Sequence, residues 1–199
     1  MAELFATFPY LENEKIIIRK MELNDVLALS EISNNDHVYQ YLPPFLYKKS
    51  NKALETAIKN LGEKDFAKKK YLIAGVYLKD NPNRLVGLAE MFDYKKRENK
   101  VTVGYRLNED YWNQKIATNV LKLMVEYLVN EVHITTLQAF VMPENYYSSK
   151  VLLNNGFVKE DFTVQEKNWG GQELVTVDVY TYKSIRCISH LSADSRARQ

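Results

Sequence analysis

A junction between two patterned stretches in the middle of the chain has residue types suited to phosphate groups. An apolar stretch ends at Leu107, and helical periodicity begins near Ile116. The first turn of a helix offers main-chain N–H groups without partners and the positive end of the helix dipole. Both suit a pyrophosphate. The junction reads Trp112-Asn113-Gln114-Lys115-Ile116-Ala117-Thr118.

Polar side chains at two other places could move protons. Glu90 ends the apolar run Leu85–Ala89, and a buried carboxylate is costly unless it is paired or functional. Glu90 is therefore a candidate general base, although a solvated strand end explains it equally well. Asn145 and Ser148 begin a helical stretch, and by themselves they indicate a cap and a first-turn residue.

The remaining reactive residue types form no recognisable site. His37, His133 and His190 are scattered without the spacing of zinc ligands. Cys187 is the single cysteine, so no internal disulfide can form, which is typical of a reducing compartment. Since we find neither a signal-peptide pattern nor an apolar run of about 20 residues, we expect a cytoplasmic protein that binds no metal and no membrane.

Charge argues against nucleic acid as a partner. The chain has 199 residues with a net charge of +2, and the segment after Tyr182 contributes four basic residues against one acidic residue. The basic excess lies in that segment rather than on a patterned face, so we expect no nucleic-acid binding. We expect one domain over residues 1–182 and a frayed or disordered tail over residues 183–199.

Hydrophobic periodicity predicts the order β-α-α-β-β-β-α-β-α-β-β. Strands are expected at residues 16–19, 71–78, 84–92, 101–107, 135–141, 157–162 and 174–182. Helices are expected at residues 24–33, from 50 through 61, at 116–131 and at 145–154. Three consecutive strands followed by strand-helix-strand units predict an α/β (α+β) fold with a mixed sheet flanked by helices.

Two segments in this order resemble the GNAT N-acetyltransferase superfamily. The stretch Val103–Thr118 looks like the family's fourth strand, pyrophosphate loop and third helix, and Pro143–Phe157 looks like its fourth helix and exit turn. The closing segment Trp169–Tyr182 is similar to the final hairpin of the branch that acetylates ribosomal-protein N-termini. The resemblance implies a mostly antiparallel sheet of six to seven strands with about four helices, and acetyl-CoA as co-substrate.

The resemblance also assigns roles to individual residues. Ser148 is the expected proton donor to the leaving thiolate, and Tyr147 or Tyr146 is a rival donor. Glu90 matches a glutamate of polyamine acetyltransferases. Asn145 is expected to contact the pantetheine arm. The expected cofactor-binding residues are Tyr105, Arg106 and Leu107, with an oxyanion donor among their main-chain groups, and Asn113, Gln114, Lys115, Ile116, Ala117 and Thr118 in the pyrophosphate loop.

Two positions depart from the family pattern. Lys115 stands where the family has the first glycine of its loop, and Thr102 stands where the ribosomal-protein branch often has a glutamate. Glycine permits positive φ and close approach to phosphate. Lys115 either adds a charge to the phosphate and preserves binding, which we favour, or weakens the site.

The resemblance implies transfer of an acetyl group from acetyl-CoA to a primary amine by direct attack through a tetrahedral intermediate. The acceptor is a protein N-terminus or a small amine such as a polyamine, and a homodimer is a further expectation. The alternatives are a catalytically degraded GNAT-fold module that binds CoA or a protein, and a scaffold without a CoA site. The apolar segment Tyr41–Tyr47 is either a partner surface, as the scaffold would require, or a lid over the acceptor site, which the family resemblance favours.

Overall fold

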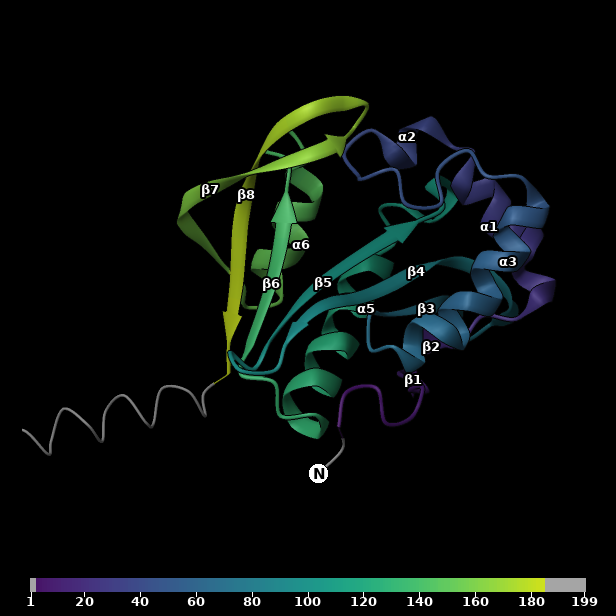
Figure 1. The fold of residues 1–199 in the computed structure, drawn as a ribbon, viewed down its shortest axis with the longest axis horizontal. Helices are drawn as coiled ribbons and strands as arrows, with labels where there is room; N and C mark the ends of the chain where they lie inside the picture. The colour runs from purple at the N-terminus through teal and green to yellow at the C-terminus, as the bar shows by residue number, and fades with distance from the viewer. Residues whose placement is uncertain (1–2, 185–199) are drawn as a thin grey trace, which may run out of the picture.

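A computed structural model describes residues 3–184 of the chain (Figure 1). Eight strands form one sheet with the order β1-β2-β3-β4-β5-β6-β8-β7. All neighbours are antiparallel except β5 and β6, which are parallel. The strands are β1 (Leu11–Glu12), β2 (Ile16–Arg19), β3 (Tyr71–Leu78), β4 (Asn81–Lys95), β5 (Lys100–Leu107), β6 (Thr136–Val141), β7 (Val158–Trp169) and β8 (Gln172–Lys183).

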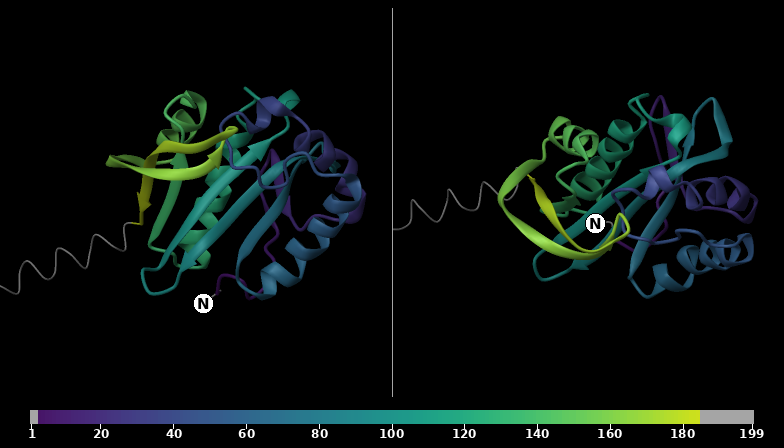
Figure 2. Two further views of the ribbon diagram at one scale, coloured as in Figure 1. Left: turned by 45° about the horizontal axis from the view of Figure 1, so that its top comes forward. Right: turned by 90° about the horizontal axis from the view of Figure 1, so that it is seen from above.

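Helices cover both faces of this sheet (Figures 1 and 2). Helices α1 and α3 pack on one face, and α5 packs on the other. Short 3₁₀ turns at Leu23–Asp25 and Glu109–Tyr111 precede α1 and α5. The α-helices are α1 (Val26–Ser33), α2 (Asp36–Tyr39), α3 (Asn51–Gly62), α4 (Lys64–Ala67), α5 (Ile116–Glu126) and α6 (Tyr146–Asn154).

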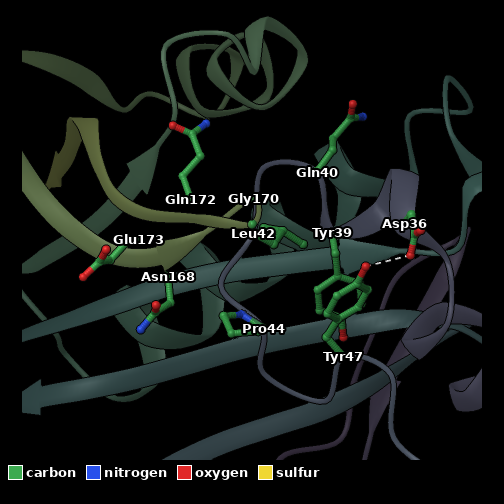
Figure 3. A pocket seen from close by; sticks show the side chains of 11 residues that line it. Asp36, Tyr39, Gln40, Leu42, Pro44, Tyr47, Asn168, Gly170, Gln172 and Glu173 are labelled. Atoms are coloured by element: carbon green, nitrogen blue, oxygen red, sulfur yellow. Dashed lines mark hydrogen bonds between the residues drawn. The ribbon is translucent and has the colours of Figure 1, made fainter.

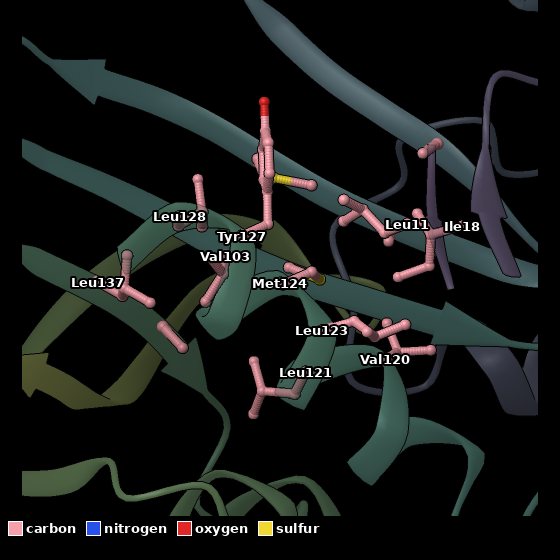
Figure 4. Close-up of a cluster of buried hydrophobic side chains, with 14 of the residues drawn as sticks. Leu11, Ile18, Val103, Val120, Leu121, Leu123, Met124, Tyr127, Leu128 and Leu137 are labelled. Atoms are coloured by element: carbon pink, nitrogen blue, oxygen red, sulfur yellow. The ribbon is translucent and has the colours of Figure 1, made fainter. Parts of the chain in front are cut away.

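Alternation along the strands creates the two cores. Ile16 and Ile18 face α5, whereas Ile17 between them faces α1 and α3. This is the period of two that any strand imposes on its side chains. Helix α5 presents Val120, Met124 and neighbouring apolar residues to the first face (Figure 4). Burial on both faces explains why these strands read as nearly continuous apolar runs.

The predicted α/β class with a mostly antiparallel sheet is confirmed, with more elements than predicted. Strand β1 has two residues, and α2 and α4 have four residues each, so none of them shows a recognisable period. The helix predicted to reach Glu131 is α-helical only to Glu126 and continues as a π-helical turn.

The C-terminal strand extends past the predicted domain end at residue 182. Lys183 pairs with Thr136, and the Ser184 N–H donates to the Thr135 carbonyl at 3.0 Å. Two residues assigned to the tail are therefore anchored to the sheet. Cys187, His190 and the rest of the predicted tail lie outside the described residues.

Candidate active site

The sheet opens between its two parallel strands. Strand β6 pairs with β5 only from Lys100 to Thr102. Beyond Thr102 the two strands diverge, as Figure 1 shows. Main-chain groups of β5 after this point are therefore available to a ligand that adds alongside the strand.

A cavity of about 80 Å³, here called the inner cavity, lies at this opening. Strands β4, β5 and β6, helix α6, the segment after α2 and the hairpin β7–β8 all contribute to its wall. Five predicted site residues line it: Glu90, Tyr105, Arg106, Asn145 and Ser148. Its aromatic lining comes from Tyr41, Phe92, Tyr105, Phe140 and Trp169.

The charged part of the inner cavity is a buried ion pair between neighbouring strands. Arg106 Nε donates to Glu90 Oε1, and Arg106 Nη2 donates to Glu90 Oε2 at 3.2 Å. The two side chains are 1% and 10% exposed. Arg106 Nη1 donates to the Phe45 carbonyl at 2.8 Å, and its guanidinium lies 5.2 Å from the Tyr39 ring centre. Glu90 is thus a paired carboxylate at the cavity wall.

The pairing favours the charged form of the arginine. Burial acts against the charged guanidinium, but the attraction and hydrogen bonding of Glu90 outweigh it and raise the pKa of Arg106 above its ordinary value. Both carboxylate oxygens of Glu90 accept from this cation. A carboxylate held in this way attracts a further positive charge less strongly than a free one.

The hydroxyl groups of Tyr105 and Ser148 form a second polar cluster at the inner cavity. Tyr105 Oη donates to Ser148 Oγ at 3.3 Å. Burial raises the pKa of Tyr105 to about 12, which keeps the phenol protonated at neutral pH. Asn145 caps α6 by accepting from the Ser148 N–H at 3.2 Å, and this cap holds Ser148 in the first turn.

Tyr147 lies on the outer surface of the same helix. Its side chain is 73% exposed and packs edge-on against Tyr146, which is 65% exposed. Neither residue lines the inner cavity. Of the hydroxyl donors that the sequence proposes, the structure places only Ser148 at the cavity.

The predicted phosphate loop leads into α5 with two residues in the left-handed region. Asn113 has φ 59° and Lys115 has φ 61°. Lys115 is exposed and is the N-cap residue, but it makes no side-chain capping bond. Gln114 Nε2 donates to the Asp110 carbonyl at 2.9 Å and closes the loop. The α5 N-terminus, with Ala117 and Thr118 in its first turn, has the geometry of an anion site, while Leu107 and Ile116 are buried in the core.

A model of the GNAT acetyltransferase domain matches residues 15–158, which is most of the chain. The chain belongs to the GNAT acetyltransferase family. Together with its relatives, this match makes it an acetyl-CoA-dependent N-acetyltransferase that transfers an acetyl group to an amine. The closely spaced N–H groups at α5 and the open edge of β5 fit acetyl-CoA.

Known relatives agree with this assignment. The chain is 26% identical over 158 residues to the uncharacterised N-acetyltransferase YoaA of Bacillus subtilis, which covers 77% of this chain and 85% of that one. The fold is similar to that of the ribosomal-protein-S5-alanine acetyltransferase of Vibrio fischeri, with TM-score 0.74, 16% identity and coverage of 89% and 97%. It is also similar to Mycobacterium smegmatis RimJ in complex with CoA-disulfide, with TM-score 0.75, 17% identity and coverage of 88% and 86%.

These neighbours confirm the predicted resemblance to the ribosomal-protein branch at the level of the fold. Among residues 3–184, no helix is both long and apolar enough to cross a membrane. In the same part of the chain, no three His, Cys, Asp or Glu side chains gather closely enough to hold a metal ion.

In the predicted phosphate loop, Lys115 has a positive φ, which is a strained backbone conformation for a non-glycine residue. A non-glycine residue in the left-handed region costs roughly 1–2 kcal/mol. We predict that Lys115→Gly raises the free energy of unfolding by about 1 kcal/mol, yet weakens acetyl-CoA binding about two- to fivefold because a phosphate partner is lost. Denaturant titration and calorimetry measure the two effects.

Lys115→Ala is the matched control, because it removes the charge and keeps the strain. It is expected to weaken binding equally without the gain in stability. Wild-type affinity in both variants would show that Lys115 makes no contact with the cofactor phosphates.

Some residues of the inner cavity were not predicted from the sequence. Gly104 faces Glu90 across β4 and β5, and Trp169 reaches the cavity from the β7–β8 turn. A glycine inside an apolar strand often marks a place where a ligand approaches the backbone. That signal was present at Gly104. Nothing local in the sequence places Trp169 there.

Proposed function

We propose that this GNAT enzyme acetylates the α-amine of a polypeptide by direct attack on acetyl-CoA at the inner cavity. The observation that carries the proposal is the convergence of Glu90, Tyr105 and Ser148 on the cavity where β5 and β6 separate. The acceptor nitrogen attacks the thioester carbonyl carbon, the N–C bond forms and the C–S bond breaks. The nitrogen loses one proton and the thiolate gains one.

The state of Glu90 favours an α-amine over a polyamine. An α-amine has a pKa of about 8, whereas an alkyl amine has a pKa of about 10.4. At neutral pH the α-amine is neutral far more often and needs less help from a base. Both oxygens of Glu90 are already hydrogen-bonded to Arg106, so the geometry leaves Glu90 poorly placed to take the departing proton. An acceptor that deprotonates easily suits such a site.

The hydroxyl pair serves the leaving group in this proposal. Ser148 passes its proton to the thiolate sulfur, and the proton released by the acceptor nitrogen returns to Ser148 Oγ through water. Tyr105 donates to Ser148 Oγ and so leaves the serine hydrogen free to point at the cofactor. Because the Tyr105 phenol donates to Ser148 Oγ, Tyr105 is a positioning donor and Ser148 is the group that meets the sulfur. Main-chain N–H groups of β5 around Tyr105–Leu107 supply the oxyanion donor.

Substitutions of Ser148 and Tyr105 discriminate between the candidate proton donors. We predict that Ser148→Ala lowers kcat by roughly 10²-fold, as removal of a general acid does. Tyr105→Phe is expected to lower kcat about fivefold to tenfold because one hydrogen bond is lost. Since the two act as a unit, the double variant should be no slower than Ser148→Ala.

Tyr147→Phe provides the comparison, because this exposed phenol is expected to leave kcat unchanged. A loss of turnover in Tyr147→Phe together with an unaffected Ser148→Ala would make Tyr147 the donor and contradict the arrangement proposed here.

The acceptor class is tested with a panel of amines at fixed acetyl-CoA. Release of free CoA thiol is measured with peptides that begin with alanine or serine, with spermidine and with alkyl amines. The proposal expects the peptides to have the highest kcat/KM. A clear preference for spermidine would instead make the enzyme a polyamine acetyltransferase.

A further inference from the structure

A second and larger cavity, here called the outer cavity, lies beside the inner one. Its volume is about 360 Å³, within the range of ligand-binding pockets. It lies between the chain from Asp36 to Tyr47 and the β7–β8 turn from Asn168 to Glu173 (Figure 3).

A thin wall separates the two cavities. Tyr41 and Pro43 line the inner cavity, Gln40 and Pro44 line the outer cavity, and Leu42 lines both. The wall is therefore one residue thick at Leu42. Displacement of Leu42 would join the outer cavity to the inner cavity.

The wall is closed by a main-chain hydrogen bond. The Gly170 N–H donates to the Leu42 carbonyl at 3.0 Å. A side chain at Gly170 would meet the Gln40 carbonyl oxygen at 2.3 Å, so only glycine permits this approach. Opening the wall breaks this single main-chain hydrogen bond, which the hydrogen bonds of a bound acceptor chain can replace.

The lining of the outer cavity suits a peptide with positive charge. The amides of Gln40, Asn168 and Gln172 can both donate to and accept from a peptide backbone. Two carboxylates, Asp36 and Glu173, line the cavity, and no lysine or arginine does.

The two carboxylates are not equivalent. Asp36 accepts from the Tyr47 hydroxyl at 2.7 Å and pairs with Lys48 at 3.1 Å, which compensates part of its charge. Glu173 is exposed and has no ion-pair partner among residues 3–184. Glu173 is therefore the main uncompensated charge at this cavity.

We propose that the outer cavity binds the residues that follow the acceptor amine and selects a basic side chain among them. The inference rests on the proposed peptide acceptor. Because an extended chain advances about 3.3–3.6 Å per residue, the second to fourth residues of the acceptor lie across the one-residue wall. Their backbone meets the amides, and a lysine or arginine side chain meets Glu173.

The test compares two peptides that differ only in having lysine or glutamine at the third residue. For the wild-type enzyme, kcat/KM is expected to be about fivefold higher for the lysine peptide, and the preference should shrink at high salt. Glu173→Gln should remove most of this preference, and Glu173→Lys should reverse it. The matched control is Glu166→Lys, on the same hairpin but outside the cavity lining, and it should keep the wild-type preference.

Peptides acetylated at equal rates by the wild-type enzyme would overturn the inference and leave the peptide acceptor standing. The same conclusion follows if Glu166→Lys changes the preference as much as Glu173→Lys. If spermidine is acetylated and no peptide is, the proposed function and the inference both fail.

Discussion

Arg106→Met is expected to lower the free energy of unfolding by about 3–5 kcal/mol, the cost of leaving the partner of a buried ion pair without its counter-charge. Glu90 is 7% exposed and would keep a carboxylate in an apolar wall. The Phe45 carbonyl would also lose its donor. Urea denaturation followed by circular dichroism measures the change.

The double variant Glu90→Leu with Arg106→Met is expected to recover most of that loss, because replacing both charges with apolar groups of similar size is often neutral or stabilising. Lys79→Met removes one partner of an exposed pair with Glu12 and should change stability far less. A loss in Arg106→Met no larger than that in Lys79→Met would contradict the buried pair.

The double variant also tests the part that Glu90 plays in turnover. If it is folded and nearly inactive, with acetyl-CoA affinity kept, the Glu90–Arg106 pair is needed for turnover. If it is folded and fully active, the pair is structural and the proton leaves through water alone.

Gly104→Val is expected to lower kcat/KM by 10²-fold or more while the protein stays folded. A Cβ at this position would lie 3.8 Å from Glu90 Oε2 and from the Phe92 ring, an ordinary contact distance. The two methyl groups of valine would then extend into a cavity of about 80 Å³ and displace the reacting atoms. Misplacement by about 1 Å is enough to cost roughly 10²-fold.

Gly104→Ala is the control for the backbone, because it adds only the Cβ. It should keep stability and lose much less activity than valine does. Steady-state kinetics and thermal unfolding of the two variants measure the effect. Full activity of a folded Gly104→Val enzyme would show that the acetyl group does not react in the inner cavity.

The sequence predicted the sheet and its main helices because burial on two faces leaves a clear apolar pattern. Strand β3 matches its predicted range of 71–78. Asn145 caps α6, and its side chain accepts from the Ser148 N–H. The short elements α2 and α4 left no such pattern, because four residues are fewer than two turns of helix.

The sequence predicted several residues of the site, but not the contacts that they make with one another. Glu90 stood out as an acid in an apolar run, but its pairing with Arg106 depends on the register that sets Glu90 opposite Gly104. Tyr147 and Ser148 are neighbours on one short helix, and only the packing of that helix shows which one reaches the cavity. The outer cavity joins segments more than 120 residues apart in the chain, so no local pattern indicates it.

Calorimetric titration of acetyl-CoA into the protein shows whether the chain binds its co-substrate. We predict saturable binding with a dissociation constant in the micromolar range, because the α5 N-terminus, preceded by Lys115 in the left-handed region, has the geometry of an anion site. Absence of binding at millimolar acetyl-CoA would contradict the acetyltransferase assignment.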